Sequence, residues 1–186
     1  MDQHGLIERA QQGDHDAFAE LVDSAIARLD AAARLILRDR ELAQDAVQDA
    51  LLRAWRDIRG LRDPGRFDAW LYRLTVHACL DQARRRRRRA VEVALDPLHL
   101  PGSPDSSGDL VRRDLLDQAL RTLDPAQRAV VALHYLLDLP LREVAEVLGI
   151  PLGTAKSRLH YALETMRSGV LEPPAGPTVV PGGQVA

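Results

Sequence analysis

A cluster of hydrogen-bond donors stands in the second half of the sequence: Thr154, Lys156, Ser157 and Arg158. Such side chains can bond to phosphate oxygens and to the acceptor atoms on base edges. The cluster follows a turn signal at Gly149 and Pro151, and a short amphipathic pattern over 141–148 precedes that turn. Ala145 is small where two helices must cross closely. The pattern predicts a helix-turn-helix whose second helix enters the major groove of DNA. The alternative is an ordinary helical hairpin, which the donor-rich start of the second helix disfavours.

A second group of side chains forms a mainly basic strip on a helix predicted to start near Phe67 and to run into the arginines at 84–89. At helical spacing, this helix has two apolar sides, so that it can pack against two neighbours and leave the strip open. The strip consists of Arg66, Arg73, His77, Asp81, Arg84 and Arg88. Cations suit a helix C-terminus, so a solvated helix end is the alternative. Six consecutive arginines exceed what capping requires, and we predict contact with nucleic acid.

A third group lies on a helix predicted from about Arg40 to Arg59. Its apolar stripe centres on Ala50 and Ala54, and the opposite face carries two carboxylates, one amide and one leucine: Asp45, Gln48, Asp49 and Leu52. Acidic outer faces are ordinary solvated surfaces. An exposed leucine framed by polar groups is more typical of a surface that docks on a partner.

The sequence offers no catalytic constellation. His77, Cys79 and Asp81 are close in sequence, but i, i+2, i+4 spacing spreads them around a helix. There is no Gly-rich phosphate loop and no nucleophile elbow. The single cysteine cannot form an internal disulfide and has no neighbouring ligands for zinc. We therefore expect a protein that is not an enzyme and holds neither a metal nor a cofactor.

These groups are positioned by helices. Of 186 residues, 46% are apolar and only 4% aromatic, with Ala and Leu dominant, which favours helix over sheet. Asp14 is placed to cap one helix, and Asp124, Pro125 and Gln127 form the signature of a capping box. The expected fold is all-α, with two small helical domains joined by a flexible linker. The expected ranges are 1–90 and 110–170 for the domains, 91–109 for the Pro/Gly/Ser-rich linker and 171–186 for a disordered tail.

The charge balance limits the kind of nucleic-acid binding. Net charge is -2, with 17 arginines against 15 acids in residues 1–90 and 8 basic residues against 12 acids in residues 91–186. This balance disfavours a DNA binder that relies mainly on overall electrostatics, so that local patches or a partner must supply the contact. The sequence shows neither a signal peptide nor an apolar run of membrane-spanning length, so we expect a cytoplasmic protein without membrane insertion.

Four motifs in this order resemble the extracytoplasmic-function (ECF) family of RNA polymerase sigma factors, over about residues 5–168. They are Asp45-Ala46-Val47-Gln48-Asp49-Ala50-Leu51-Leu52-Arg53-Ala54-Trp55, Phe67-Asp68-Ala69-Trp70-Leu71-Tyr72-Arg73-Leu74, Leu123-Asp124-Pro125-Ala126-Gln127-Arg128, and the stretch from Glu143 through Gly153-Thr154-Ala155-Lys156-Ser157-Arg158-Leu159. The resemblance implies a subunit that binds core RNA polymerase, directs it to promoters and helps to open the DNA.

The resemblance also implies roles for individual residues. Asp45, Gln48 and Asp49 match positions that dock on the coiled coil of the largest polymerase subunit, and Leu52 lies on the same face. The segment from Gly60 and the helix after it match the part that melts the minus-ten element, which assigns to that element Arg66, Arg73, His77, Arg84 and Arg88. His77 stands where the family usually has Asn. The resemblance also places six residues of the second half against the minus-thirty-five element, with Arg158 nearer the phosphates: Thr154, Lys156, Ser157, Arg158, His160 and Tyr161.

The expected partners are core RNA polymerase, promoter DNA and an anti-sigma protein that holds the two domains together. A stand-alone helix-turn-helix regulator remains the main alternative, although its helix-turn-helix would be paired with a receiver or ligand-binding domain. A small enzyme that processes RNA is a second alternative, against which the lack of clustered carboxylates argues.

Overall fold

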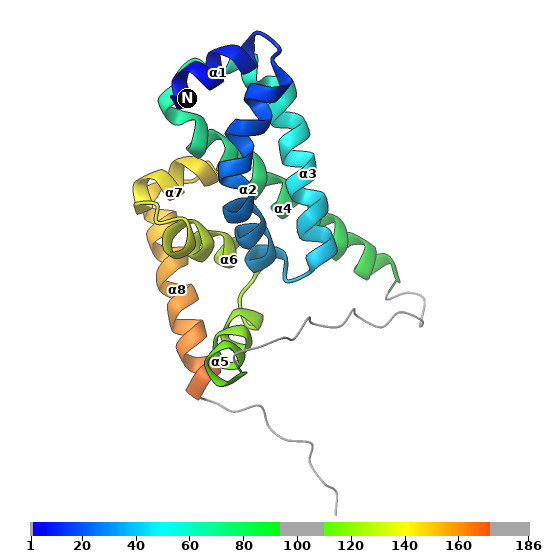
Figure 1. Ribbon diagram of the computed structural model, residues 1–186. Coiled ribbons are helices and arrows are strands. Elements are labelled where there is room, and N and C mark those ends of the chain that lie inside the picture. Colours follow the sequence, from blue (N-terminus) through cyan, green and yellow to red (C-terminus); the bar gives the residue numbers. More distant parts are fainter. Residues whose placement is uncertain (1, 94–109, 172–186) are drawn as a thin grey trace, which may run out of the picture.

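The computed structural model describes residues 2–93 and 110–171 (Figure 1). Within these ranges the chain is helical and contains no β-strand, as expected for an all-α fold. The α-helices are α1 Gln3–Gln11, α2 His15–Leu37, α3 Arg40–Asp57, α4 Phe67–Val93, α5 Leu110–Arg121, α6 Pro125–Val131, α7 Leu141–Leu148 and α8 Leu152–Leu171. The expected linker and tail lie almost wholly outside the described residues.

Side-chain caps set the starts of the helices where the sequence predicts them. The carboxylate of Asp14 accepts hydrogen bonds from the backbone N–H groups of Asp16 and Ala17, at 3.0 and 3.1 Å. Asp124 accepts from the N–H of Gln127 at 2.8 Å, and the Gln127 side chain accepts from the N–H of Asp124 at 2.9 Å. This is a complete capping box, with Pro125 at the first helical position.

The first half of the molecule is a bundle of α1 to α4, in which α2 and α4 are central (Figure 1). Helix α3 packs on α2 and α4 through small residues, since Ala43, Ala46, Ala50 and Ala54 are all fully buried. Two short 3-10 turns, η1 Ile58–Gly60 and η2 Pro64–Arg66, connect α3 to α4. Small buried side chains bring the three helices close, so α3 exposes only its outer face.

The second half consists of α5 to α8. A π-helical turn, η3 Ala132–Leu136, continues α6 toward α7, and Asp138 after it has a positive φ of 56°. The ring nitrogen Nδ1 of His134 lies 2.8 Å from the carbonyl oxygen of Leu139. This irregular segment leads the chain into α7, which packs on η3 and α8, while α8 packs on α6.

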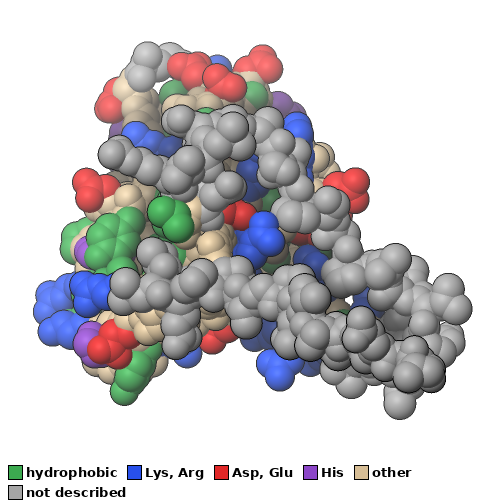
Figure 2. Space-filling view, turned by 90° about the horizontal axis from the view of Figure 1, so that it is seen from below, with side chains coloured by type: hydrophobic (Ala, Val, Ile, Leu, Met, Phe, Trp, Pro, Cys, Tyr) green, Lys and Arg blue, Asp and Glu red, His purple; other side chains and the backbone are tan. Residues whose placement is uncertain are grey.

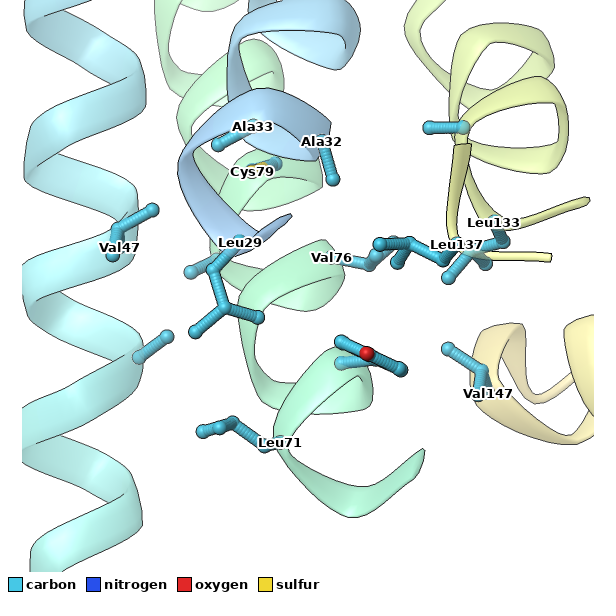
Figure 3. Packing of buried hydrophobic residues seen from close by; sticks show 14 of the residues in the cluster. Leu29, Ala32, Ala33, Val47, Leu71, Val76, Cys79, Leu133, Leu137 and Val147 are labelled. Atoms are coloured by element: carbon cyan, nitrogen blue, oxygen red, sulfur yellow. The ribbon is translucent and has the colours of Figure 1, made fainter. Parts of the chain in front are cut away.

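The two halves pack against each other through a shared apolar core. Helix α2 meets α6 and η3, and α4 meets α7. Figure 3 shows Val76 of α4 pointing toward Leu133 and Leu137, with Val147 of α7 nearby. Val76, Leu133 and Val147 are each at most 3% exposed. The halves therefore bury apolar surface in a closed arrangement, which is the favourable term that holds them together.

Polar contacts join the halves around this core. Arg128 is 8% exposed, and its Nε donates to the carbonyl of Ile36 in α2 at 2.7 Å. Its Nη1 donates to the carbonyls of Leu120 and Leu123 at the end of α5. Arg38, which has a positive φ of 54°, pairs with Asp117 at 2.9 Å. We call Arg38, Asp117 and Arg128 the interdomain clasp.

Cys79 lies inside the first half, between α4 and α2, close to Ala33 (Figure 3). Its side chain is fully buried, and burial raises the pKa of the thiol to about 12. The shift arises because removing a thiolate from water is unfavourable, and no positive charge in the described ranges offsets this cost.

Candidate functional site

The predicted helix-turn-helix is formed by α7 and α8. Gly149 ends α7 in the left-handed region with φ 64°, and the N–H of Ile150 donates to the carbonyl of Ala145 at 3.0 Å. Glycine adopts this conformation without the strain that a Cβ would bring. Ala145 and Ala155 are buried where the two helices meet, as the sequence predicts for Ala145. The motif is therefore present with the geometry expected of a DNA-reading unit.

The residues predicted to read the upstream element lie along one side of α8. Lys156, Ser157, His160 and Tyr161 are exposed, and Thr154 and Arg158 are half-buried. Tyr161 is 60% exposed, so its ring is accessible to a partner. The Ser157 hydroxyl donates to the carbonyl of Gly153 at 3.0 Å. His160 lies 3.5 Å from Glu164.

The basic strip runs along the outside of α4. Arg73, Arg84 and Arg88 are exposed and His77 is half-buried, while the apolar residues on either side pack into the core. Arg84 also pairs with Asp81. Arg66 precedes α4 and pairs with Glu146 of α7 at 3.1 Å, so in the closed arrangement one end of the strip contacts the second half. The structure thus brings the strip together as predicted, except that Arg66 is drawn toward α7.

His77 has an altered acid–base equilibrium. Burial, and then the nearby positive charge of Arg73, lower the pKa of its imidazole, while Asp81 acts in the opposite direction. The ring is therefore neutral at pH 7 and has one N–H donor and one acceptor nitrogen. A neutral imidazole therefore offers both a donor and an acceptor, as the amide of Asn does.

The predicted docking face is the outer side of α3. Asp45, Gln48 and Leu52 are exposed, and Leu52 is 63% exposed. Asp49 is half-buried and accepts a hydrogen bond from Arg53 at 2.6 Å. Helix α3 contacts α2, α4 and η1, and α7 and α8 lie on the other side of the bundle (Figure 1). The docking face is therefore open in the closed arrangement.

The interdomain clasp was not predicted as a unit. Arg128 belongs to a motif in the sequence, but its acceptors are backbone carbonyls. Every residue has a backbone carbonyl, so the sequence does not indicate which ones Arg128 bonds to. A weak signal was available for Arg38, which ends a long apolar helix just before the cap residue Asp39 of the next helix.

Metal binding has no support in the described ranges, where no group of three or more His, Cys, Asp or Glu side chains could hold an ion. Likewise, no helix of residues 2–93 and 110–171 combines the length and the apolar character needed to cross a bilayer.

Two known protein families match the chain, one in each of its two halves. Residues 21–89 match the family "Sigma-70 region 2", and residues 113–166 match "Sigma-70, region 4". The first match ends at the last arginine of the run in α4, and the second contains α7, the turn and α8 as far as residue 166. CarQ, an RNA polymerase sigma factor of Myxococcus xanthus, is 32% identical over 164 residues, which cover 87% of this chain and 93% of CarQ.

The ECF sigma factor SigL of Mycobacterium tuberculosis is 36% identical over 132 residues, which cover 69% of this chain and 75% of SigL. The chain belongs to the ECF RNA polymerase sigma factors. SigW of Bacillus subtilis is 28% identical over 176 residues, 87% of this chain and 92% of SigW. As a sigma factor, this protein binds core RNA polymerase and directs it to promoter DNA, and it is not itself an enzyme.

Solved structures agree with this fold. CnrH, in a complex with the cytosolic domain of CnrY, is 27% identical to this sigma factor, with a TM-score of 0.63 over 88% of this chain and 93% of CnrH. RpoE of Bartonella quintana, solved with the anti-sigma factor NepR, has a TM-score of 0.67 at 24% identity, over 83% of this chain and 96% of RpoE.

Proposed function

We propose that this sigma factor divides its work among three surfaces. The outer face of α3, with Asp45, Gln48, Asp49 and Leu52, docks on core polymerase. The strip of Arg66, Arg73, His77, Arg84 and Arg88 binds the minus-ten element and its melted strand. Residues Thr154, Lys156, Ser157, Arg158, His160 and Tyr161 bind the minus-thirty-five element in the major groove, with Arg158 on the phosphates.

The observation that carries the docking part of this proposal is the exposure of Leu52. A leucine that is 63% exposed and is framed by Asp45 and Gln48 gains nothing for folding, whereas burial against a partner would remove its apolar surface from water. The near-neutral charge of the chain supports the same division, because an acidic docking face offsets the basic strip.

We also propose that a second protein regulates this sigma factor by binding the closed arrangement. The solved complex of CnrH with the cytosolic domain of CnrY provides a precedent in a relative of the same fold. A partner that binds the closed arrangement better than the open one shifts the population toward the closed one. We expect this regulation, like transcription itself, to take place in the cytoplasm.

Transcription with purified core polymerase tests the proposal as a whole. Core enzyme with this sigma factor should start transcription at a small set of sites in a genomic fragment library, and the starts should share two upstream elements. A sigma factor with the Asp45→Arg and Asp49→Arg changes should lose these starts. Binding to the same DNA fragments without core polymerase would instead favour the stand-alone regulator.

Lys156→Ala and Arg158→Ala are expected to differ in their effect on promoter choice. If Lys156 bonds to a base edge, its loss should relax the preference at one upstream base pair by about 1–3 kcal/mol. Arg158→Ala should weaken all upstream sequences alike and reduce the salt dependence of binding. Holoenzyme binding to a randomised upstream element measures both. No loss from either change would rule out α8 as the recognition helix.

The two halves are expected to separate on polymerase. The two promoter elements lie roughly two turns of DNA apart, at about 34–36 Å per turn, so we expect the halves to move apart to reach both. Spin labels on Ala27→Cys and Ser168→Cys, both exposed positions in opposite halves, should report a longer distance with core polymerase than in the free protein. An unchanged distance would contradict the separation.

A further inference from the structure

A cavity of about 870 Å³ opens between the two halves, beside the interdomain clasp. It is lined by the end of α2, the arginine-rich part of α4, the turn between α5 and α6, and Arg158 of α8. Its volume is in the range of small-molecule sites, which is about 300–1,000 Å³. The cavity exists only while the halves are in contact, because its walls come from both of them.

The walls of this cavity are strongly positive. Seven of the fourteen lining residues are arginines, and Asp124 is the one acid among them. The Asp124 carboxylate is already occupied as the cap of α6. Lys and Arg side chains come to the surface at several places on the lower face of the molecule (Figure 2). A concave surface with one sign of charge concentrates ligands of the opposite sign.

Neighbouring carboxylates balance this charge only in part. Arg84 pairs with Asp81, Arg86 with Asp39 at 3.3 Å, and Arg38 and Arg121 share Asp117. In the described part of the chain, no carboxylate pairs with Arg87 or Arg158. Arg128 donates only to neutral carbonyls. Burial, and then the charge of Arg38, lower the pKa of Arg128 to about 10, so the cations of this cavity repel one another.

The cavity also has an apolar wall. Leu37, Leu80 and Ala83 lie on its first-half side, and Pro125 and Ala126 on its second-half side. Guanidinium groups bind phosphate oxygens with two parallel hydrogen bonds, and an apolar wall can bury a flat ring. The cavity therefore fits a ligand that carries several negative charges, and its apolar wall leaves room for an uncharged part of that ligand.

We propose that this interdomain cavity binds a small molecule that carries a polyphosphate group. The arginines of α4, α5 and α8 contact the phosphates, and the apolar wall accepts the remainder of the ligand when there is one. The shared chemistry is the polyphosphate chain, which inorganic polyphosphate and nucleoside polyphosphates have in common.

Such a ligand would hold the closed arrangement, because its contacts come from both halves. It would also occupy Arg84 and Arg158, to which we assign promoter contacts. This consequence depends on the proposed roles of these two arginines in promoter binding, whereas the binding of polyphosphate to the cavity does not.

Calorimetric titration of the full-length protein tests the site. Sodium tripolyphosphate at an ionic strength of about 0.15 M should bind with one site per chain. Changing Arg87→Gln and Arg121→Gln together should weaken this binding about tenfold or more. The matched control is Arg85→Gln with Arg89→Gln, which removes the same charge from two exposed arginines of α4 that do not line the cavity. The control should stay within about twofold of the original protein, because long-range charge is screened.

ATP and GTP, titrated without divalent cations, identify the source of the phosphate. Tighter binding of a nucleotide than of tripolyphosphate supports the site and assigns the apolar wall to the base, and equal binding supports it with inorganic polyphosphate as the ligand. Equal losses in the cavity variant and the control would overturn the proposal, since the binding would then reflect charge alone. Absence of saturable binding with one site per chain would overturn it as well. None of the four arginines is buried, so circular dichroism should show unchanged helix content.

Discussion

Reversal of two carboxylates on α3, Asp45→Arg with Asp49→Arg, should weaken binding to core RNA polymerase by about a hundredfold or more. Like charges brought together in an interface cost several kcal/mol, and about 2.7 kcal/mol is a factor of one hundred. The fold should survive, because both residues lie opposite the buried alanines of α3. The reversal at Asp49 also removes its ion pair with Arg53 and leaves two cations four residues apart, which costs only a few tenths of a kcal/mol.

The control for this prediction removes the same charge elsewhere. Glu20→Arg with Asp23→Arg changes two exposed acids of α2, outside the docking face, and should leave the affinity for core polymerase within about threefold. Biolayer interferometry with immobilised core enzyme measures the affinity of both variants, and circular dichroism checks their helix content. If the α3 variant is folded and keeps its affinity, the docking face lies elsewhere.

Replacement of Arg128 by Met should lower the free energy of unfolding by about 3 kcal/mol or more. The carbonyls of Ile36, Leu120 and Leu123 would lose their donor, and a buried acceptor without a partner costs about 1–3 kcal/mol. Methionine fills most of the volume of the arginine stem, so the loss reports on hydrogen bonds more than on packing. Urea unfolding followed by circular dichroism measures the effect.

Arg121→Met is the matched change at an exposed arginine of the same interface. Its ion pair with Asp117 is at the surface, and its loss should cost less than about 1 kcal/mol. Because Ile36 belongs to the first half, Arg128→Met should also broaden the label distances between Ala27→Cys and Ser168→Cys. Equal stability of the two methionine variants would show that Arg128 does not stabilise the closed arrangement.

The helices and their starts could be predicted because the relevant physics is local. Asp14 and Asp124 cap helices through N–H groups two or three residues away, and such contacts are visible in the sequence. The exposure of Leu52 followed from the period of the apolar stripe on α3. The positions of the three proposed surfaces on exposed helix faces follow from the same period.

Contacts between distant segments could not be predicted in this way. Arg128 bonds to Ile36, which is 92 residues away, and a carbonyl is present at every residue, so the sequence does not single out this acceptor. The packing of Val76 against Leu133 and Leu137 depends on how the two halves meet. The apolar pattern of each half does not show which of its residues face the other half. The π-helical turn at Ala132–Leu136 is similarly set by the reversal of the chain toward α7.

The burial of Cys79 makes the protein its own reporter of unfolding. A thiol reacts as the thiolate, and a pKa of about 12 leaves only a trace of that form at neutral pH. Maleimides and disulfide reagents should therefore modify the native chain only through global opening of the first half, at a rate that follows its stability. The same protection leaves cysteines introduced at Ala27 and Ser168 as the reactive thiols, so selective labelling needs no cysteine-free background.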